Sequence, residues 1–393
     1  MILVFFIFAE ILFFLKIIIM INKISFKNYK LFKEKQTLEI KPITILIGKN
    51  NSGKSAVLKL PTLISGSLSG EFAQPFDNEY EGVRIGLNQE DAFYNREITN
   101  DSLNFEVFED DNFIVNATII GDINSNIRLK RLLVKDEEID LKSIKTKGFI
   151  PDGVSLEMLN FDYIEAFRNK PFANFQKKTS EILKVGINGE NAYSLFAKYY
   201  DEKSPVYKLI SDWYFKNFEN WKLEVNQIPS SVISYEITLR NGTNKPINIV
   251  NTGSGISQSF PLILRSFMPV EEPTLIIIEE PETHLHPAAH GNLAERFVDS
   301  YLEDNNRSYL IETHSQNFVL RMRRLVAEGK IKAEQLAIYY VDFKEDLNES
   351  ILQRILVDEF GRVEWWPEGI FSETLSETIA IRTAQIDNPK YGN

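Results

Sequence analysis

The stretch that decides the fold is GKNNSGKS, residues 48–55. It matches the pattern G-x-x-x-x-G-K-[ST]. It directly follows an apolar run at residues 43–47, interrupted only by Thr44, which predicts a strand buried on both faces. A helix is predicted over residues 54–64, although Pro61 is expected to end or kink it early. A strand, a glycine-containing turn and a helix in this order predict a phosphate-binding loop (P-loop) for a nucleotide.

The fixed positions of this loop suit phosphate chemistry. Glycines let backbone N–H groups turn inward around phosphate oxygens, and the start of the helix adds a partial positive charge. Lys54 is expected to reach the β- and γ-phosphates, and the Ser55 hydroxyl is expected to be a magnesium ligand. The candidate nucleotide-binding residues of the loop are Gly48, Asn50, Asn51, Ser52, Gly53, Lys54 and Ser55.

A second signal lies downstream at residues 274–282, TLIIIEEPE. An apolar run that ends in two acids predicts a buried strand with carboxylates at its C-terminal end, where open α/β sheets bind ligands. We expect Glu279 to hold magnesium through a water molecule. We expect Glu280 to act as the general base toward the attacking water. Many P-loop proteins have aspartate at the first position, and glutamate is one methylene longer.

The composition narrows the chemistry further. The chain has 393 residues, a formal charge of −11, 44% hydrophobic and 25% charged residues, and no cysteine. This composition is that of a folded protein, so it excludes disordered, collagen-like and disulfide-framework classes. The lack of cysteine excludes zinc-finger, thiol-nucleophile and iron–sulfur chemistry and fits a reducing compartment, so we expect the cytoplasm. The acidic balance argues against non-specific coating of nucleic acid.

Residues 1–19 are strongly apolar, and only Glu10 and Lys16 interrupt them. Their length just reaches that of a membrane span, but Glu10 would lie near the middle, where an acid is costly. A signal peptide is disfavoured because no basic region precedes the run and no small-residue cleavage site follows it. We interpret the segment as an upstream in-frame extension before a natural start at Met20, with a membrane anchor as the alternative.

The rest of the chain alternates between strand and helix patterns. Strands are predicted at residues 21–29, 36–40, 104–109, 113–120, 127–134, 232–240, 275–278 and 308–311. Residues 155–222 have a mostly helical pattern, and further helices are predicted at residues 256–266 and 287–301, the latter with Pro287 in its first turn. No heptad run is long enough for a coiled coil.

Two motifs together resemble a known family. Residues 279–287, EEPETHLHP, and residues 310–315, LIETHS, are similar to those of ABC-type ATPases of the RecF/SMC/OLD-like group. More narrowly, they resemble bacterial proteins named "AAA family ATPase" that are common in phage-defence and toxin-like operons. Residues 20–29, 251–258 and 366–371 also resemble this subfamily. The resemblance implies an α/β fold: a P-loop NTPase of the ABC-ATPase head type, with an antiparallel β subdomain and a helical lobe.

The resemblance also implies a division of the chain after the segment 1–19. We expect an N-terminal ATPase lobe with the phosphate-binding loop and the β subdomain at residues 20–150. A helical lobe and insert should follow at 151–250. The signature turn, the acidic strand and the switch histidine should occupy 251–345, and a C-terminal β tail should occupy 346–393.

Further residue roles follow from the resemblance. In ABC-type ATPases two heads face each other with ATP between them, so we expect a homodimer or higher oligomer. The turn formed by Gly253, Ser254 and Gly255 would open a helix and present N–H groups to the γ-phosphate of the opposite subunit. His314 would be the switch residue that contacts the γ-phosphate or the attacking water, and it joins Glu280 as a candidate catalytic residue.

Other polar residues give weaker signals. His284, His286 and His290 could suggest a metal site, but Pro287 separates a turn from a helix, so they need not converge. Gln89 could link magnesium to the lobes, and Arg168 lies in a segment typical of the subfamily without a derivable role. The basic residues Arg321, Arg323, Arg324, Lys330 and Lys332 could contact a phosphate backbone, although such a run is usually a solvated helix face.

The predicted function is therefore an ATPase that uses ATP and Mg²⁺, dimerises around ATP and controls a partner, in bacterial defence. A separate effector protein, a nuclease or a toxin, is expected because the segment after His314 is short. The alternative is a RecF-like DNA-binding ATPase of DNA repair or chromosome maintenance, which the lysine excess between residues 20 and 60 keeps open. A third reading is a membrane-associated ATPase, which the interpretation of residues 1–19 disfavours. A GTPase is disfavoured because residues 244–247, NKPI, lack the acid of the base-reading motif.

Overall fold

The computed structural model describes residues 21–69, 75–124, 126–141, 160–176, 184–229 and 233–387. The apolar segment 1–19 lies outside these residues, so both of its interpretations stay predictions. Within the described ranges, no helix is long and apolar enough to cross a membrane.

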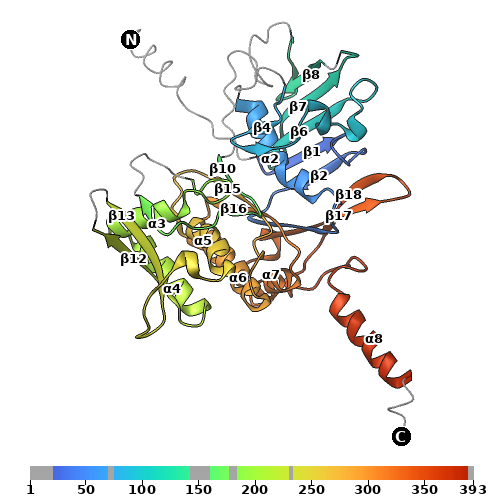
Figure 1. Cartoon of the computed structure of the whole chain (residues 1–393). Helices are drawn as coiled ribbons and strands as arrows, with labels where there is room; N and C mark the ends of the chain where they lie inside the picture. The colour runs from blue at the N-terminus through green and yellow to red at the C-terminus, as the bar shows by residue number, and fades with distance from the viewer. Residues whose placement is uncertain are drawn as a thin grey trace, which may run out of the picture.

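A six-stranded mixed sheet lies at the centre of the described chain (Figure 1). In spatial order its strands are β10 (Asn160–Ile164), β15 (Thr274–Glu279), β16 (Arg307–Glu312), β3 (Ile43–Gly48), β17 (Leu336–Lys344) and β18 (Glu349–Ile355). All neighbouring pairs are parallel except β17 and β18, which are antiparallel. The carboxyl ends of β15, β16 and β3 therefore meet at one edge of the sheet, where ligands bind in open α/β folds.

Side chains of the central strands alternate between two hydrophobic clusters. Ile43, Ile45 and Ile47 belong to one cluster, and Leu46 belongs to the other. Both faces of β3 are thus covered, which explains why its sequence is almost continuously apolar rather than alternating. Each fully buried aliphatic side chain contributes about 1.5–3 kcal/mol, so a polar residue in these strands needs a specific partner.

Further sheets flank this centre (Figure 1). An antiparallel sheet at one end contains β2 (Gln36–Glu39), β1 (Lys23–Lys27), β6 (Leu103–Glu109), β7 (Asn112–Gly121), β8 (Ile127–Val134) and β9 (Glu137–Glu138). A third sheet contains β11 (Phe175–Gln176), β13 (Ser234–Arg240), β12 (Lys222–Ile228) and β14 (Ile247–Asn248), and a hairpin contains β4 (Glu79–Tyr80) and β5 (Val83–Arg84).

The α-helices cover both faces of the central sheet and form a lobe beside it. They are α2 (Lys54–Ser69), α3 (Ala192–Asp201), α4 (Pro205–Asn217), α5 (Ser254–Phe267), α6 (Pro287–Glu303), α7 (Gln316–Ala327) and α8 (Glu373–Asp387). Short 3₁₀ helices are η1 (Gln89–Ala92), η2 (Tyr94–Arg96), η3 (Ile249–Asn251) and η4 (Ala333–Gln335). In Figure 1, α3, α4, β12 and β13 lie together at the end opposite the antiparallel sheet, and α8 projects from the body.

The sequence-based elements differ from the structure at several places. Within the C-terminal β tail expected at residues 346–393, the structure describes the strand β18 and then the helix α8. Helix α2 continues through Pro61 to Ser69 rather than ending early. Residues 61–68 of this helix are all buried, and their burial offsets the roughly 3 kcal/mol that an interior proline costs. The helical pattern expected for residues 155–222 is wrong at its start, because Asn160–Ile164 forms β10, which pairs with β15.

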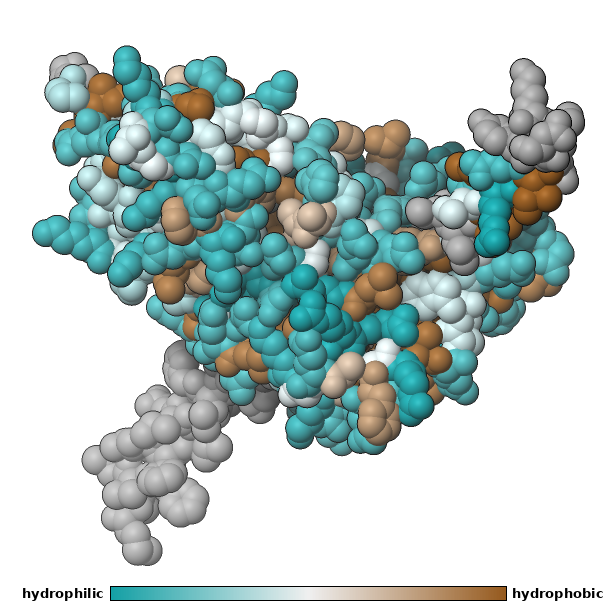
Figure 2. Space-filling view, turned by 90° about the horizontal axis from the view of Figure 1, so that it is seen from below, coloured by the Kyte–Doolittle hydropathy of each residue, from teal (hydrophilic) through white to brown (hydrophobic). Residues whose placement is uncertain are grey.

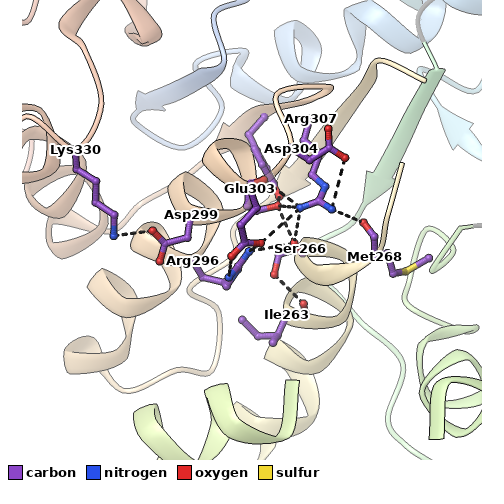
Figure 3. Close-up of polar contacts among 11 residues, drawn as sticks. Ile263, Ser266, Met268, Arg296, Asp299, Glu303, Asp304, Arg307 and Lys330 are labelled. Atoms are coloured by element: carbon purple, nitrogen blue, oxygen red, sulfur yellow. Dashed lines mark hydrogen bonds and ion pairs between the residues drawn. The ribbon is translucent and has the colours of Figure 1, made fainter. Parts of the chain in front are cut away.

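A cluster of hydrogen bonds and ion pairs links the C-terminal end of α5 and helix α6 to the start of β16 (Figure 3). The Arg307 guanidinium donates to the Met268 carbonyl oxygen at 2.9 Å and to the Ser300 hydroxyl at 3.0 Å. Arg296 donates to Glu303 and, at 3.3 Å, to the Ser266 carbonyl oxygen. This cluster fixes the C-terminal end of α5 at the start of β16, whose other end reaches the candidate site.

The surface seen in Figure 2 is mostly hydrophilic, and its hydrophobic residues are scattered among polar ones. Among the exposed large hydrophobic side chains, Leu320 lies in α7 and Leu347 in the turn between β17 and β18. Scattered apolar residues of this kind are ordinary on a protein surface and need no specific explanation.

Candidate nucleotide-binding site

The phosphate-binding loop connects β3 to α2 through two glycines that no other residue could replace without strain. A Cβ atom at Gly48 would lie 2.3 Å from the Val341 carbonyl oxygen of the neighbouring strand β17. Gly53 has a φ of +100°, a conformation that side-chain-bearing residues rarely adopt. These two positions let the loop turn tightly at the edge of the sheet and open α2.

Lys54 and Ser55 both contact Glu312, the last residue of β16. The Ser55 hydroxyl donates a hydrogen bond to Glu312 Oε2 at 2.9 Å, and Lys54 Nζ lies 3.6 Å from Glu312 Oε1. Lys54 Nζ also donates to the Lys49 carbonyl oxygen at 2.8 Å. Burial lowers the pKa of Lys54, while Glu312 opposes this change by favouring the ammonium form. The lysine is therefore held inside the loop by its own backbone and by one buried acid.

Glu280 follows β15 in a strained backbone conformation. Its φ is +40°, and its N–H donates to the Glu312 carbonyl oxygen at 2.9 Å. The Thr283 hydroxyl donates to Glu280 Oε2 at 3.1 Å, and His314 Nε2 lies 3.9 Å from Glu280 Oε1. Strained residues of this kind persist where the surrounding structure fixes them, and they cluster at functional sites.

His314 follows β16 and faces both Glu280 and Lys54. Burial and the positive charge of Lys54 lower the pKa of His314, and Glu280 opposes the shift. The ring is therefore biased toward its neutral form, which can accept a hydrogen bond from water or donate one.

One open cavity of about 600 Å³ collects most of the predicted residues. Its lining includes Asn50, Asn51, Gly53, Lys54, Ser55, Glu280, Glu312 and His314. Gly48 and Ser52 do not line it; Ser52 is buried within the loop. Glu279 and the turn at residues 253–255 do not line the cavity either.

Glu279 contacts the β10 region and Lys59 of α2. Its carboxylate accepts a hydrogen bond from the Tyr163 hydroxyl at 2.5 Å and one from the Ala166 N–H at 3.4 Å. Lys59 Nζ lies 3.8 Å from it. Its role as a metal ligand stays a prediction.

The signature turn, residues 253–255, lies at the start of α5, where it is expected. Gly253 is the N-cap of the helix, and Gly253 and Ser254 are exposed. A Cβ at Gly255 would lie 2.9 Å from the His284 carbonyl oxygen, so the turn packs against the loop that follows Glu280. Its predicted contact with the nucleotide of an opposite subunit stays a prediction.

Three residues that carry polar contacts in this site had no role assigned from the sequence. Glu312 is described above. Glu282 joins the two loops, because its carboxylate accepts from the His314 N–H at 2.6 Å and from the Thr313 hydroxyl at 2.8 Å. The Arg168 guanidinium donates to the carbonyl oxygens of the two residues at the end of β15, and burial lowers its pKa to about 10. The feature of the sequence that could have indicated Glu312 is an acidic residue at the end of a second buried strand.

The remaining histidines do not form a metal cluster among the residues that the structure describes. His286 caps α6 by accepting from the Ala288 N–H at 3.2 Å. His290 contacts the Ser315 hydroxyl at 2.7 Å. Gln89 lies in η1, donates to the Phe76 carbonyl oxygen at 2.9 Å, and does not line the cavity.

Two family profiles match the chain. One, described as "AAA domain, putative AbiEii toxin, Type IV TA system", matches residues 43–321. The other, described as "Protein of unknown function (DUF3696)", matches residues 331–380. No curated protein matches the sequence.

Solved structures of SMC heads have a similar fold. The SMC head bound to the C-winged helix domain of ScpA gives a TM-score of 0.51 at 13% identity and covers 86% of this chain and 98% of its own. The SMC head domain from Thermotoga maritima gives 0.46 at 11% identity, with 86% and 99% covered. The Pyrococcus furiosus head with an extended coiled coil, bound to the C-terminal domain of ScpA, gives 0.46 at 12% identity, with 92% and 99% covered.

The fold is that of SMC ATPase heads, which confirms the predicted fold class, and the family profile confirms the resemblance to proteins with an AAA ATPase domain. The chain belongs to the AAA-domain family of the AbiEii toxin type, whose profile spans well over half of its length.

Proposed function

We propose that the chain binds ATP with Mg²⁺, hydrolyses it and dimerises around it, and that this cycle controls a separate effector protein in bacterial defence. The observation that carries the proposal is the shared cavity, in which Lys54 and Ser55 face Glu280 and His314. In-line attack of water on a γ-phosphate needs a positively charged loop that holds the phosphates. It also needs an acidic side chain and a neutral histidine on the opposite side, which can position the water and accept its proton.

The donors in the cavity fit Mg²⁺. The nearest ligand atoms of Glu280, Glu312 and His314 all lie within 4.8 Å of one another, and the Ser55 hydroxyl is 2.9 Å from Glu312. Mg²⁺ prefers oxygen ligands and usually binds through one or two carboxylates together with substrate phosphates and water. When bound, the ion would neutralise charge on the β- and γ-phosphates. The chain's own residues position the phosphates and accept the proton from water.

The exposed signature turn supports dimerisation. Gly253 and Ser254 lie at the N-terminus of α5, are exposed and do not line the cavity of their own chain. The first N–H groups of a helix have no partner within the helix and attract anions. A second head would bring this turn to the γ-phosphate. The family description, which names a toxin system, supports the defence role.

The DNA-binding alternative rested on local positive charge, and much of that charge is paired within the chain. Near the N-terminus the ion pairs are Lys23–Asp111, Lys27–Glu34, Lys35–Glu106, Lys41–Glu39 and Lys59–Glu279, and in α7 and the following turn they are Arg321–Glu295, Arg324–Glu328 and Lys330–Asp299. Paired charges release fewer counterions on contact with a phosphate backbone, so we favour the protein effector.

The test combines phosphate release with mass measurement. The purified chain is expected to release phosphate from ATP when Mg²⁺ is present and to double in mass by light scattering when ATP cannot turn over. A chain that binds no ATP, or that stays monomeric with bound ATP, would refute the respective part of the proposal. Gel shifts with duplex DNA at two salt concentrations, with and without ATP, would test the alternative.

A further inference from the structure

Glu312 occupies an unusual position for an acid. It ends β16, the strand between β3 and β15, and only 5% of its surface is exposed. Its two neighbours at the same level of the sheet are Leu46 of β3 and Glu279 of β15. An apolar residue would fill this place at less cost, because a buried carboxylate loses its hydration. A carboxylate at this position therefore needs polar partners that replace its lost hydration.

Both oxygens of this carboxylate point to the phosphate-binding loop. Oε2 accepts the Ser55 hydrogen bond at 2.9 Å, and Oε1 lies 3.6 Å from Lys54 Nζ. Burial raises the pKa of Glu312, and Lys54 and Ser55 oppose that shift. The hydroxyl predicted to bind magnesium is therefore in direct contact with Glu312.

Glu279, the acid that the sequence pattern selects as metal ligand, has other partners. Its oxygens accept hydrogen bonds from the Tyr163 hydroxyl and the Ala166 N–H, and Lys59 Nζ of α2 lies 3.8 Å from Oε1. It neither lines the cavity nor belongs to the group of carboxylates and histidine that could hold an ion. Releasing it toward Ser55 would cost the short Tyr163 hydrogen bond.

We propose that Glu312, and not Glu279, is the carboxylate that holds Mg²⁺ together with Ser55 when nucleotide binds. The proposal rests on the proposed function, because it assigns a residue to the same ATP site. A serine hydroxyl has two lone pairs, so Ser55 can turn its proton away and offer an oxygen to the ion. Glu312 then supplies the anionic oxygen beside it, and Lys54 is freed to contact the phosphates.

The experiment measures how strongly Mg²⁺ promotes ATP binding, which requires no turnover. For each protein, the dissociation constant of ATP is measured by calorimetry with excess Mg²⁺ and with EDTA. The constant in EDTA divided by the constant in Mg²⁺ gives a ratio that measures how strongly Mg²⁺ promotes ATP binding, and this ratio is compared between proteins. We expect Glu312→Gln to lower this ratio at least about tenfold relative to wild type, while Glu279→Gln leaves it within about twofold. In EDTA, Glu312→Gln should bind ATP as tightly as wild type or more so, because a negative charge beside the phosphates is removed.

A merely structural role for Glu312 would weaken ATP binding equally with and without Mg²⁺, and the ratio would not move. That result, or a loss of the ratio in Glu279→Gln alone, would overturn the proposal. Electron paramagnetic resonance of Mn²⁺ added with ATP gives an independent reading, since Glu312→Gln should release Mn²⁺ that Glu279→Gln retains.

A second variant covers the case in which Glu312→Gln does not fold. Glu312→Asp keeps the charge but shortens the side chain by one methylene, so it should give a ratio below those of wild type and Glu279→Gln, with a smaller loss than the roughly tenfold loss expected when the charge is removed. A wild-type ratio in Glu312→Asp together with a lost ratio in Glu279→Gln would overturn the assignment. Wild-type protein that binds no ATP in either condition would instead refute the proposed function, and the two failures are thus distinct.

Discussion

The side-chain amide of Gln258 forms two hydrogen bonds with the main chain of Arg168. Its Oε1 accepts from the Arg168 N–H at 3.1 Å, and its Nε2 donates to the Arg168 carbonyl oxygen at 2.8 Å. The Arg168 guanidinium in turn donates to the carbonyl oxygens of Glu279 at 2.7 Å and Glu280 at 3.2 Å. One buried arginine therefore joins the helix that begins at the signature turn to the strand end that carries the proposed general base.

The first prediction concerns this arginine. We expect Arg168→Met to lower the free energy of unfolding by about 1–3 kcal/mol, because two buried carbonyl oxygens lose their donor. Turnover of ATP should fall more than ATP affinity, because the strained Glu280 loses a support. Urea denaturation and phosphate release measure both effects, with the exposed Arg131→Met as the control. Normal turnover in a folded Arg168→Met protein would contradict this role.

The second prediction tests the phosphate-binding loop. Lys54→Ala should weaken ATP binding by roughly 10–100-fold, since hydrogen bonds to a charged group contribute about 1.5–3 kcal/mol each. Fluorescence titration with a labelled nucleotide measures the affinity. Lys33→Ala, which removes an exposed lysine, is the matched control. If Lys54→Ala keeps wild-type affinity, the loop does not hold the nucleotide.

The third prediction separates binding from hydrolysis. Glu280→Gln should keep ATP affinity and reduce turnover by about 10²–10⁴-fold, the range expected for loss of a general base. With ATP it should then persist as a dimer in light scattering. Glu271→Gln, an exposed acid before β15, controls for the loss of one charge. Hydrolysis by Glu280→Gln at the wild-type rate would remove Glu280 from the mechanism.

The fourth prediction concerns pH. Burial and Lys54 lower the pKa of His314 below its usual 6.5, so the folded protein binds its proton less readily than the unfolded chain. The ring should stay neutral at pH 7 and become protonated only as the pH falls through the lowered pKa. The contribution of His314 to stability should decline over that same acid range. Nuclear magnetic resonance titration, with the signal assigned by its loss in His314→Gln, measures the midpoint. A midpoint at or above 6.5 would contradict the expected environment.

The fifth prediction concerns the cluster of Figure 3. Arg307→Met should lower the free energy of unfolding by about 2–4 kcal/mol, because Met268, Ser300 and Ser266 lose a buried donor. Arg324→Met removes an exposed arginine paired with Glu328 and should change stability little. Equal effects of the two substitutions on thermal unfolding would show that the buried contacts contribute nothing.

The sequence predicts the elements that follow simple patterns. The buried strands β3 and β15 are near-continuous apolar runs, and α6 begins at a proline, so residue type alone indicates them. The strand β10 escaped notice because Asp162 interrupts it, and this acid is stable there only because Arg265 of α5 pairs with it inside the protein. A partner 103 residues away cannot be read from local pattern.

The same reason limits prediction of the site. Lys54, Ser55, Glu280 and His314 lie in recognisable motifs, and the structure brings them to one cavity. The contacts of Glu312, Glu282 and Arg168 depend on which strands are neighbours. The order β15, β16, β3 places the end of β16 against the phosphate-binding loop, and strand order is not contained in any single segment.

Helix α5 is fastened at three places along its length: by Arg168 at Gln258, by Asp162 at Arg265, and by Arg307 at Met268. If the central sheet stays fixed, α5 cannot pivot about either end without breaking one of these contacts. A displacement of its first turn at Gly253 would therefore be opposed by contacts to β10, to the end of β15 and to the start of β16. A partner that binds the turn would thus bind a surface that hydrogen bonds through Arg168 join to the strand end before Glu280.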